Sequence, residues 1–265
     1  MTEARAEIGV IGGSGFYAFL DDTETVEVET PFGAPSAPIT IGAVGDRTVA
    51  FLPRHGTDHR FPPHQVPYRA NAWALKDLGV TRVFGPCAAG SLRKDILPRT
   101  LVVSDQAIDF TKTRANTFYD GPQTTHVSFA EPYCPTLRET LVKTAASQGI
   151  EHRDGGTMAV IEGPRFSTVA ESRMYAQLGA DVIGMTQFPE VTLARELELC
   201  YANVALVTDF DVGVDDIPQV THQEVLKVFG ENIDKVRDLL FAAIPAVPEE
   251  RTCPCATALA GTGHG

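Results

Sequence analysis

Two acidic residues close together offer the clearest catalytic chemistry in the sequence. Asp209 and Asp211 close a predicted buried strand at residues 204–207, in the segment Thr-Asp-Phe-Asp. On an extended segment, residues two apart point to the same face, so both carboxylates could reach one ligand. Paired acids shift each other's pKa, so one could keep a proton near neutral pH and donate it. The alternative is a pair of solvated acids in a turn.

A second group of residues predicts a site for a small anion such as phosphate. Arg54 and His55 follow a predicted strand at 48–52, and an arginine offers bidentate donors to an oxyanion. Small-residue turns at 12–15 and 85–91 each follow a predicted strand and could present backbone N–H groups, with the Ser14 hydroxyl as a further donor. A glycine turn without a ligand is the alternative.

Metal chemistry is not expected from the histidines. His55, His59 and His64 lie within ten residues, but the segment has neither an H-E-x-x-H motif nor a Cys/His frame. Residues 60–64 are predicted to form a mobile lid or a solvated loop.

The stretch 156–186 is expected to position several of these groups. A strand at 157–161 ends at Glu162, and Thr168 with Glu171 has capping-box spacing for a helix that ends near Gly179. A further strand, at 181–183, precedes Met185 and Thr186. Ligands of open α/β sheets bind at the carboxyl ends of strands, which is where Glu162, Phe166, Met185 and Thr186 fall. Phe166 and Met185, each taken alone, are equally typical of core residues.

The remaining pattern predicts one α/β domain over residues 1–265, around a mixed sheet. Strands are expected at 8–11, 25–30, 39–41, 48–52, 81–84, 101–103 and 204–207; helices at 68–78, 135–147, 190–200 and 221–243; a long loop at 111–130; and a loose tail at 245–265. Residues 13–18 match the G-x-G-x-x-A dinucleotide pattern. That pattern needs a following helix, and the alternation at 25–30 favours a strand instead.

The composition of the chain limits the kinds of partner and compartment that we expect. The chain has 265 residues, 43% of them hydrophobic, and a net charge of −12, so we expect neither a membrane span nor a nucleic-acid partner. Five cysteines and an N-terminus unlike a signal peptide predict reduced thiols and a cytoplasmic protein. Cys253 and Cys255 lack zinc-ligand spacing and are expected to be free, or else a redox-labile disulfide.

Ten segments carry a resemblance to a known family. They read IGVIGGSG, TPFGAPS, PRHG, PYRANAWAL, FYDG, AEPYCP, IEGPRFST, ADVIGMT, LARELELCYA and LVTDFD. In register from about residue 8 to residue 244, the sequence resembles the methylthioadenosine phosphorylases of the trimeric purine nucleoside phosphorylase superfamily. The resemblance implies a single domain with a mixed, partly barrel-like sheet flanked by helices.

The resemblance also implies a reaction: phosphorolysis of 5′-methylthioadenosine to adenine and 5-methylthioribose 1-phosphate, in purine and methionine salvage. Phosphate is then a co-substrate, and no cofactor or metal is needed. The phosphate-binding positions it implies are Ser14, Arg54, His55, Cys87, Ala88 and Thr186. The nucleoside-binding positions it implies are Phe166 on the purine, Met185 under the ribose, Asp209 and Asp211 on the base, and Leu226 at the 5′ pocket. His126 is implied to enter the 5′ pocket of a neighbouring subunit in a homotrimer.

Departures from the family pattern leave a competing activity open. Cys87 stands where a threonine is usual, Gly184 where some members have asparagine, and Gln187 is also non-standard. The competing activity is phosphorolysis of a 6-oxopurine nucleoside such as inosine, guanosine or methylthioinosine. The pair of aspartates favours adenine, since an ionised acid repels O6 of an oxopurine. A non-catalytic nucleoside-binding module is disfavoured because the phosphate-binding residues are present.

Overall fold

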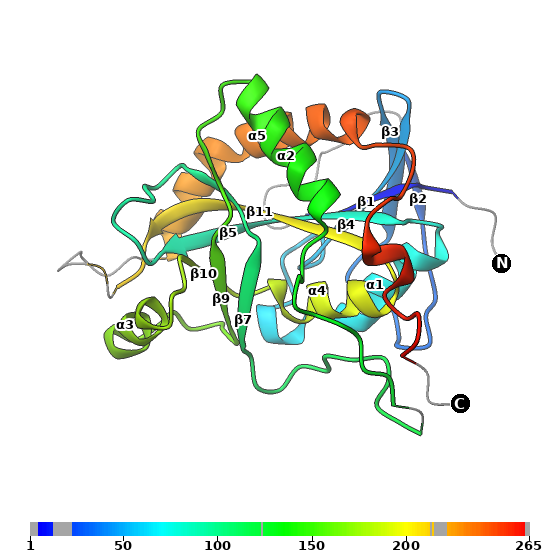
Figure 1. Ribbon diagram of the computed structural model, residues 1–265, viewed down its shortest axis with the longest axis horizontal. Helices are drawn as coiled ribbons and strands as arrows, with labels where there is room; N and C mark the ends of the chain where they lie inside the picture. The colour runs from blue at the N-terminus through cyan, green and yellow to red at the C-terminus, as the bar shows by residue number, and fades with distance from the viewer. Residues whose placement is uncertain (1–4, 13–22, 123, 213, 215–221, 263–265) are drawn as a thin grey trace.

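One mixed sheet forms the centre of the molecule (Figure 1). The computed structural model describes residues 5–12, 23–122, 124–212, 214 and 222–262, without the side chains of residues 222, 224–226 and 229. Within these residues the sheet has eleven strands. Eight of them lie side by side in the order β2-β3-β4-β1-β5-β10-β9-β7. The sheet branches at β5, which also pairs with β11; β11 pairs with β6, and β6 pairs with β8. Helices flank the sheet, which confirms the predicted fold class.

The strands are β1 (Ile8–Gly12), β2 (Glu24–Val26), β3 (Ile39–Val44), β4 (Arg47–Pro53), β5 (Arg82–Ser91), β6 (Leu101–Val103), β7 (Gln106–Phe110), β8 (His152–Asp154), β9 (Thr157–Ile161), β10 (Val182–Gly184) and β11 (Cys200–Phe210). The α-helices are α1 (Tyr68–Asp77), α2 (Pro135–Ser147), α3 (Val169–Gln177), α4 (Gln187–Glu196) and α5 (His222–Ala246). Short 3-10 turns lie at Pro63–Gln65 and Pro254–Thr257.

Two helical layers cover the two faces of the sheet. In Figure 1, α2 and α5 lie on one side of β11 and β5, while α1 and α4 lie on the other. Successive side chains of a strand point to opposite faces. In β11, Val204 and Leu206 pack with α2 and α5, whereas Ala205 and Val207 pack with α1 and α4. The continuous apolar run of this strand therefore follows from burial on both faces.

The predicted turn at 85–91 is wrong, because these residues continue the strand that begins at Arg82. All of β5 runs parallel to β11, from the Arg82–Cys200 pair to the Ser91–Phe210 pair. Small residues are needed here for close packing and not for a turn. A Cβ at position 85 would lie 2.0 Å from the Tyr201 hydroxyl oxygen, so only glycine fits.

Other predicted boundaries also move. The strand expected at 25–30 is limited to Glu24–Val26, where it pairs with β3. The helix expected at 190–200 begins at Gln187, has non-helical angles at Phe188 and ends at Glu196, and Cys200 already begins β11. Strands β7 and β8 were not predicted, and β7 is half-exposed, so it lacks a clear apolar pattern. The capping box of Thr168 and Glu171 is confirmed at the start of α3.

The C-terminal segment is not loose, contrary to the prediction. Arg82 Nη2 donates to the carbonyl oxygens of Pro248 and Glu249, and Arg47 Nη2 donates to that of Val247 at 2.6 Å. Cys255 is only 1% exposed. The arginines lie outside the tail and bond its backbone carbonyl oxygens, so these contacts require no hydrophobic periodicity in the tail sequence. This is why the sequence pattern did not predict that the tail is packed against the sheet.

Some sequence predictions lie outside the described residues: the glycine turn with Ser14, the G-x-G-x-x-A match at 13–18, Thr221 at the predicted start of the last helix, and the side chain of Leu226. No helix among the residues that the structure describes is long and apolar enough to cross a membrane.

Candidate active site

The carboxyl ends of β1 and β4 bring Arg54 against the middle of β5 and the first turns of α4. The Arg54 backbone N–H donates to Gly12 O at 2.7 Å, and its Nη1 donates to Pro86 O at 3.0 Å. Its Nη2 donates to Glu190 Oε2 at 3.0 Å, and its Nε also donates to Glu190. Thr186 is the N-cap of the same helix and makes no side-chain capping bond. Predicted phosphate-binding positions from three segments therefore converge.

The Arg54 side chain is committed to this ion pair. Arg54 and Glu190 are each 1% exposed. Burial alone would lower the pKa of Arg54, but the Glu190 carboxylate raises that pKa above its usual range, so the guanidinium stays charged. The pair is close to electrically neutral. Arg54 thus fixes the floor of the candidate site through these bonds.

Cys87 belongs to a buried polar network below the same floor. Asn203 Nδ2 lies 2.9 Å from Gly85 O and 3.3 Å from Cys87 Sγ, and Tyr201 Oη lies 2.7 Å from Glu190 Oε2. Burial raises the pKa of the Cys87 thiol, although the Arg54 charge opposes this. Cys87 therefore remains a neutral thiol at neutral pH and a weak hydrogen-bond donor.

His55 is held as a neutral imidazole. Its Nδ1 lies 2.8 Å from Phe61 O, and because a carbonyl oxygen only accepts, Nδ1 carries the proton. Burial, followed by the Arg54 charge, lowers the pKa of His55 to about 4. Nε2 is left as an acceptor, suited to a protonated oxygen of phosphate. Phe61 also packs with Val66 and Tyr68, so the segment expected to be a lid or solvated loop is anchored there.

Asp209 and Asp211 lie together at the end of β11, as predicted. A Cβ on Gly90 would lie 3.1 Å from Asp209 Oδ1 and 3.7 Å from Asp211 Cβ, so this glycine leaves room beside both acids. The register shifts between Val207 and Asp209, which turns the strand end. Thr208 Oγ1 donates to Asp209 Oδ2 at 2.6 Å.

Asp211 differs from its neighbour in burial. It is 6% exposed, and its Oδ2 has no hydrogen-bond partner within the described part of the chain. Burial raises the pKa of Asp211, although Ser172 favours its ionised form. Burial therefore favours the protonated form of Asp211.

The anion-binding and acidic groups are joined through β5. Ala88 is two residues from Gly90 on this strand, a separation of about 6.6 Å in an extended chain. A Cβ on Gly184 would lie 3.7 Å from Ala88 O and 3.3 Å from Met158 Sδ. Met158 thus occupies part of the space that an asparagine at 184 would need. Met185 and Thr186 follow directly, next to the phosphate positions.

Phe166 and Met185 are placed differently. Met185 packs against the cluster around Ile161 and Ile183, and its Sδ would lie 2.6 Å from a Cβ on Gly163. Phe166 is 40% exposed, which is unusual for a large aromatic ring. It precedes Ser167, whose buried Oγ also has no partner in the described residues.

Two residues that the sequence reasoning did not single out organise the site. Glu190 neutralises Arg54, and Arg114 Nη1 and Nη2 donate to the carbonyl oxygens of Met185 and Glu162, both at 2.6 Å. Arg114 thereby ties the ends of β9 and β10. It lies in the loop 111–130, whose length was the only sequence signal for such a role.

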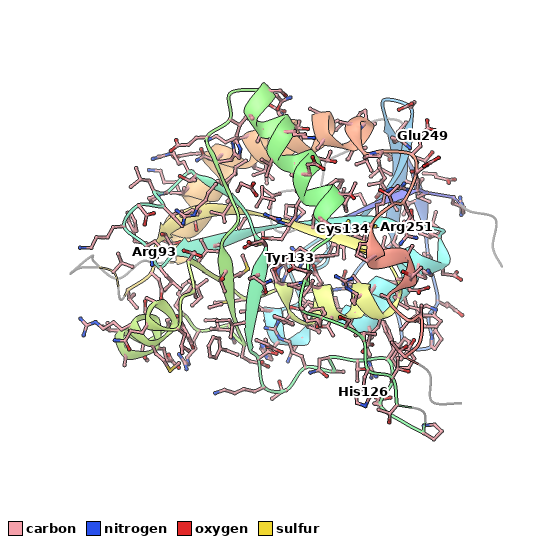
Figure 2. The ribbon with its side chains drawn as sticks, viewed as in Figure 1. Arg93, His126, Tyr133, Cys134, Glu249 and Arg251 are labelled. Atoms are coloured by element: carbon pink, nitrogen blue, oxygen red, sulfur yellow. The ribbon has the colours of Figure 1, made fainter. Side chains whose placement is uncertain are left out.

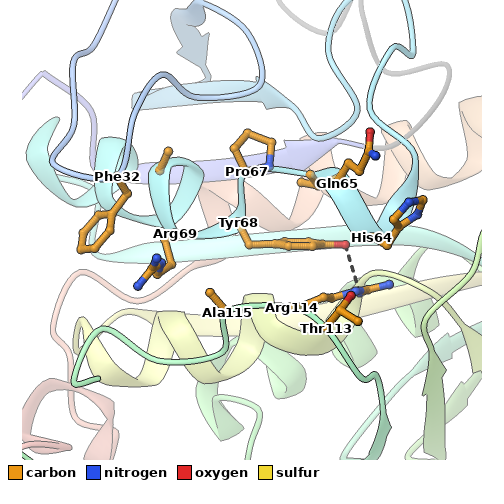
Figure 3. A pocket seen from close by; sticks show the side chains of 11 residues that line it. Phe32, His64, Gln65, Pro67, Tyr68, Arg69, Thr113, Arg114 and Ala115 are labelled. Atoms are coloured by element: carbon orange, nitrogen blue, oxygen red, sulfur yellow. Dashed lines mark hydrogen bonds between the residues drawn. The ribbon is translucent and has the colours of Figure 1, made fainter. Parts of the chain in front are cut away.

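A cavity of about 250 Å³ lies on the outer side of Arg114 (Figure 3). Tyr68 Oη accepts a hydrogen bond from Arg114 Nη1 at 3.1 Å, and Phe32, His64 and Arg69 line the opening. Among the described residues, none of the predicted site positions lines this cavity, and Arg114 is its link to the groups described above.

Three predicted positions are not joined to this group. Ser14 and the side chain of Leu226 lie outside the described residues. His126 is exposed on the long loop, and Figure 2 shows it far from Arg93, which follows the end of β5. Its placement leaves it outside the site of its own chain.

Comparison with known proteins shows the family to which this chain is similar. The model of the family described as "Phosphorylase superfamily" matches residues 7–245. A purine nucleoside phosphorylase of Streptomyces coelicolor is 51% identical, covering 99% of this chain and 98% of the relative. An S-methyl-5′-thioadenosine phosphorylase of Thermococcus kodakarensis is 56% identical, covering 95% and 97%.

A solved structure agrees with these relatives. Methylthioadenosine phosphorylase from Schistosoma mansoni, in complex with adenine, superposes with a TM-score of 0.89 at 38% identity and covers 93% of each chain. The resemblance noted in the sequence is confirmed along nearly the whole chain. This chain therefore belongs to the phosphorylase superfamily.

Proposed function

We propose that this chain catalyses the phosphorolysis of 5′-methylthioadenosine, releasing adenine and 5-methylthioribose 1-phosphate. The carrying observation is the buried Asp211, whose Oδ2 has no partner in the described residues and whose pKa is raised, beside Asp209 at the end of β11. Relatives named S-methyl-5′-thioadenosine phosphorylase, at more than half identity, support the same substrate.

The phosphate is proposed to bind where Arg54, His55, Cys87, Ala88 and Thr186 converge, with Ser14 as a further donor. His55 Nε2 accepts a hydrogen bond from a protonated phosphate oxygen, because Nδ1 already donates to Phe61 O. The Thr186 hydroxyl is not used to cap its helix and is free to donate to the anion. Phosphate is a co-substrate, and we propose no cofactor or metal for the reaction.

The base is proposed to bind further along β5 than the phosphate, beside the two aspartates that adjoin Gly90. One phosphate oxygen attacks C1′ while the C1′–N9 bond breaks, and the electron pair of that bond leaves with the base. Asp211 donates its proton to N7, which makes adenine a better leaving group; help from a general acid is typically about 10²–10⁴-fold. Asp209 accepts a hydrogen bond from the 6-amino group. Phe166 stacks on the purine, Met185 lies under the ribose, and Leu226 contributes to the 5′ pocket.

A second candidate function rests on the Streptomyces coelicolor relative, which is named purine nucleoside phosphorylase and matches nearly the full chain. Under this candidate the substrate is a 6-oxopurine nucleoside, with O6 facing Asp209. The two ionisable acids oppose it, because a carboxylate cannot donate to O6 unless it is protonated.

A panel of nucleosides separates the two candidates. The purified chain is incubated with phosphate and, in turn, methylthioadenosine, adenosine, inosine, guanosine and methylthioinosine, and base release is followed by chromatography. We expect the highest kcat/KM for methylthioadenosine. A higher kcat/KM for inosine or guanosine would replace the first candidate with the second.

We also infer that the chain works as a homotrimer in the cytoplasm. Exposed His126 supports the assembly, since it is outside its own site and free to enter a neighbour's. Phe32, Trp73 and Phe118 form a partly exposed aromatic cluster near the same long loop. The cytoplasmic location rests on the odd number of cysteines.

A further inference from the structure

Four of the five cysteines lie together in the fold, although they come from three separate segments of the sequence. Cys134, Cys200, Cys253 and Cys255 place their sulfur atoms within 4.8 Å of one another. Three of them are at most 2% exposed, and Cys253 is half-buried. The cluster lies where the start of α2, the start of β11 and the C-terminal segment meet, at the Cys134 label in Figure 2.

The separations match one metal centre. A tetrahedral zinc site with Zn–S bonds of about 2.3 Å places its sulfur atoms roughly 3.8 Å apart. The Sγ atoms of Cys200 and Cys253 are 3.3 Å apart, and no pair among the four sulfur atoms exceeds 4.8 Å. Two disulfides would instead need two separate short pairs at about 2.05 Å each. Four sulfur atoms around one centre are the donor set of a closed structural zinc site.

The backbone holds two of the four cysteines in place. Cys134 is the N-cap of α2, and Cys200 is the first residue of β11. The Cys134 N–H donates to Tyr201 O at 2.8 Å, and the Cys200 N–H donates to Thr81 O at 3.0 Å. These bonds hold two of the four cysteines on the sheet without any contact from the C-terminal segment.

We propose that Cys134, Cys200, Cys253 and Cys255 bind one structural Zn²⁺ that fastens the C-terminal segment to the sheet. The site is separate from the proposed active site and does not depend on the proposed reaction. Sequence spacing alone predicted no metal at Cys253 and Cys255, because the other two ligands come from positions 53 to 121 residues earlier in the chain. Metal binding stabilises a fold when the ligands are assembled only in the folded state.

Metal analysis of the full, untagged chain tests the proposal directly. The chain is produced in zinc-supplemented medium under reducing conditions, dialysed, and analysed by elemental mass spectrometry. We expect about one zinc per chain, retained against a weak chelator. Replacement of zinc by Co²⁺ should give the intense visible bands of a tetrahedral cobalt thiolate. Zinc below a tenth of the chain concentration, or intramolecular disulfides among these four cysteines in the mass spectrum, would overturn the proposal.

Paired variants locate the ligands. Cys253→Ser with Cys255→Ser leaves the interior thiols in place and should abolish zinc retention and lower the Tm by several degrees. Cys87→Ser, whose thiol lies outside the cluster beside Asn203, should keep the zinc. Retention of zinc by the double variant, or its loss from the Cys87 variant, would show that the metal is bound elsewhere. The wild-type metal content decides the question even if the double variant folds poorly.

Discussion

At the scale of single residues, the proposed choice of base rests on the two aspartates. Thr208 Oγ1 donates to Asp209, whereas Asp211 is buried with an unpartnered Oδ2 in the described structure. The sequence predicted that both acids would face one ligand. It could not predict that the pKa of Asp211 is raised, because burial causes this shift and burial cannot be read from the spacing.

We expect Asp209→Asn to lower kcat/KM for methylthioadenosine at least about tenfold and to raise the relative use of inosine. The new amide N–H opposes the 6-amino group of adenine but suits O6, and an unpaired buried polar group costs about 1–3 kcal/mol. Steady-state kinetics at saturating phosphate measure the effect, with Asp238→Asn on the exposed side of α5 as the control. An unchanged ratio between the two substrates would contradict the role given to Asp209.

His55 should make the fold sensitive to mild acid. Its pKa is about 4 in the folded chain against 6.5 for the free side chain, so the unfolded chain binds more protons between these values. Stability is therefore complete above pH 6.5 and falls as the pH drops toward 4, by about 2 kcal/mol at pH 5.

Urea unfolding at pH 7.5 and pH 5 measures this loss. His55→Asn should lose less stability between the two pH values than the wild type, because asparagine does not titrate. His126→Asn, at an exposed position, should behave like the wild type. Equal losses in all three chains would show that other groups cause the acid sensitivity.

At the scale of elements, the parallel pair of β5 and β11 determines where the site residues lie. The apolar run 204–207 was recognised as a strand, but β5 was predicted to stop at Phe84. Glycine, proline and alanine at 85–90 are typical of turns, and only the contact with Tyr201 shows why a strand needs them. Pairing between distant segments overrides local propensity here.

Gly85→Ala should disrupt this pair of strands. Its Cβ would lie 2.0 Å from Tyr201 Oη, so the ring must move and release its contact with Glu190. We expect a loss of about 2–4 kcal/mol of unfolding free energy, measured in urea. Gly230→Ala in α5, with no atom within 4 Å of the new Cβ, should instead gain about 0.5–1 kcal/mol. Equal effects of the two substitutions would contradict the packing argument.

Arg54 links β4, β5 and α4, so its removal should affect stability and phosphate binding together. Arg54→Ala leaves Glu190 buried without its partner, at a cost of about 3–5 kcal/mol. We expect it to raise the KM for phosphate more than that for the nucleoside. Glu190→Gln separates the two effects: it removes the ion pair but leaves the Arg54 charge, so its phosphate KM should change less. Unchanged phosphate dependence in Arg54→Ala would remove Arg54 from the phosphate site.

At the scale of the whole molecule, the C-terminal segment and the assembly were the hardest features to predict. The segment is fixed by Arg47, Arg82 and the cysteine cluster, and none of these contacts leaves a periodic pattern in the tail sequence. The fold class and the positions of Asp209, Asp211, Arg54 and His55 were predictable because each follows a recognisable apolar strand.

Mixing two inactive variants tests the proposed exchange of His126. Asp211→Asn lacks the acid, and His126→Ala lacks the residue lent to the neighbour. Random mixed trimers should contain about a quarter of sites with both wild-type groups, so activity should return to roughly that fraction. Light scattering should give three times the mass of one 28.5 kDa chain. A monomer with full activity would contradict the assembly, and no recovery on mixing would contradict the exchange.

Phosphorus NMR of the products tests the central claim most directly. The chain is incubated with 5′-methylthioadenosine and inorganic phosphate, and the ³¹P spectrum is recorded while adenine is measured by chromatography. We predict one new sugar phosphate signal for each adenine released, and no adenine release when phosphate is omitted. Adenine released without phosphate, or without a matching sugar phosphate, would contradict phosphorolysis.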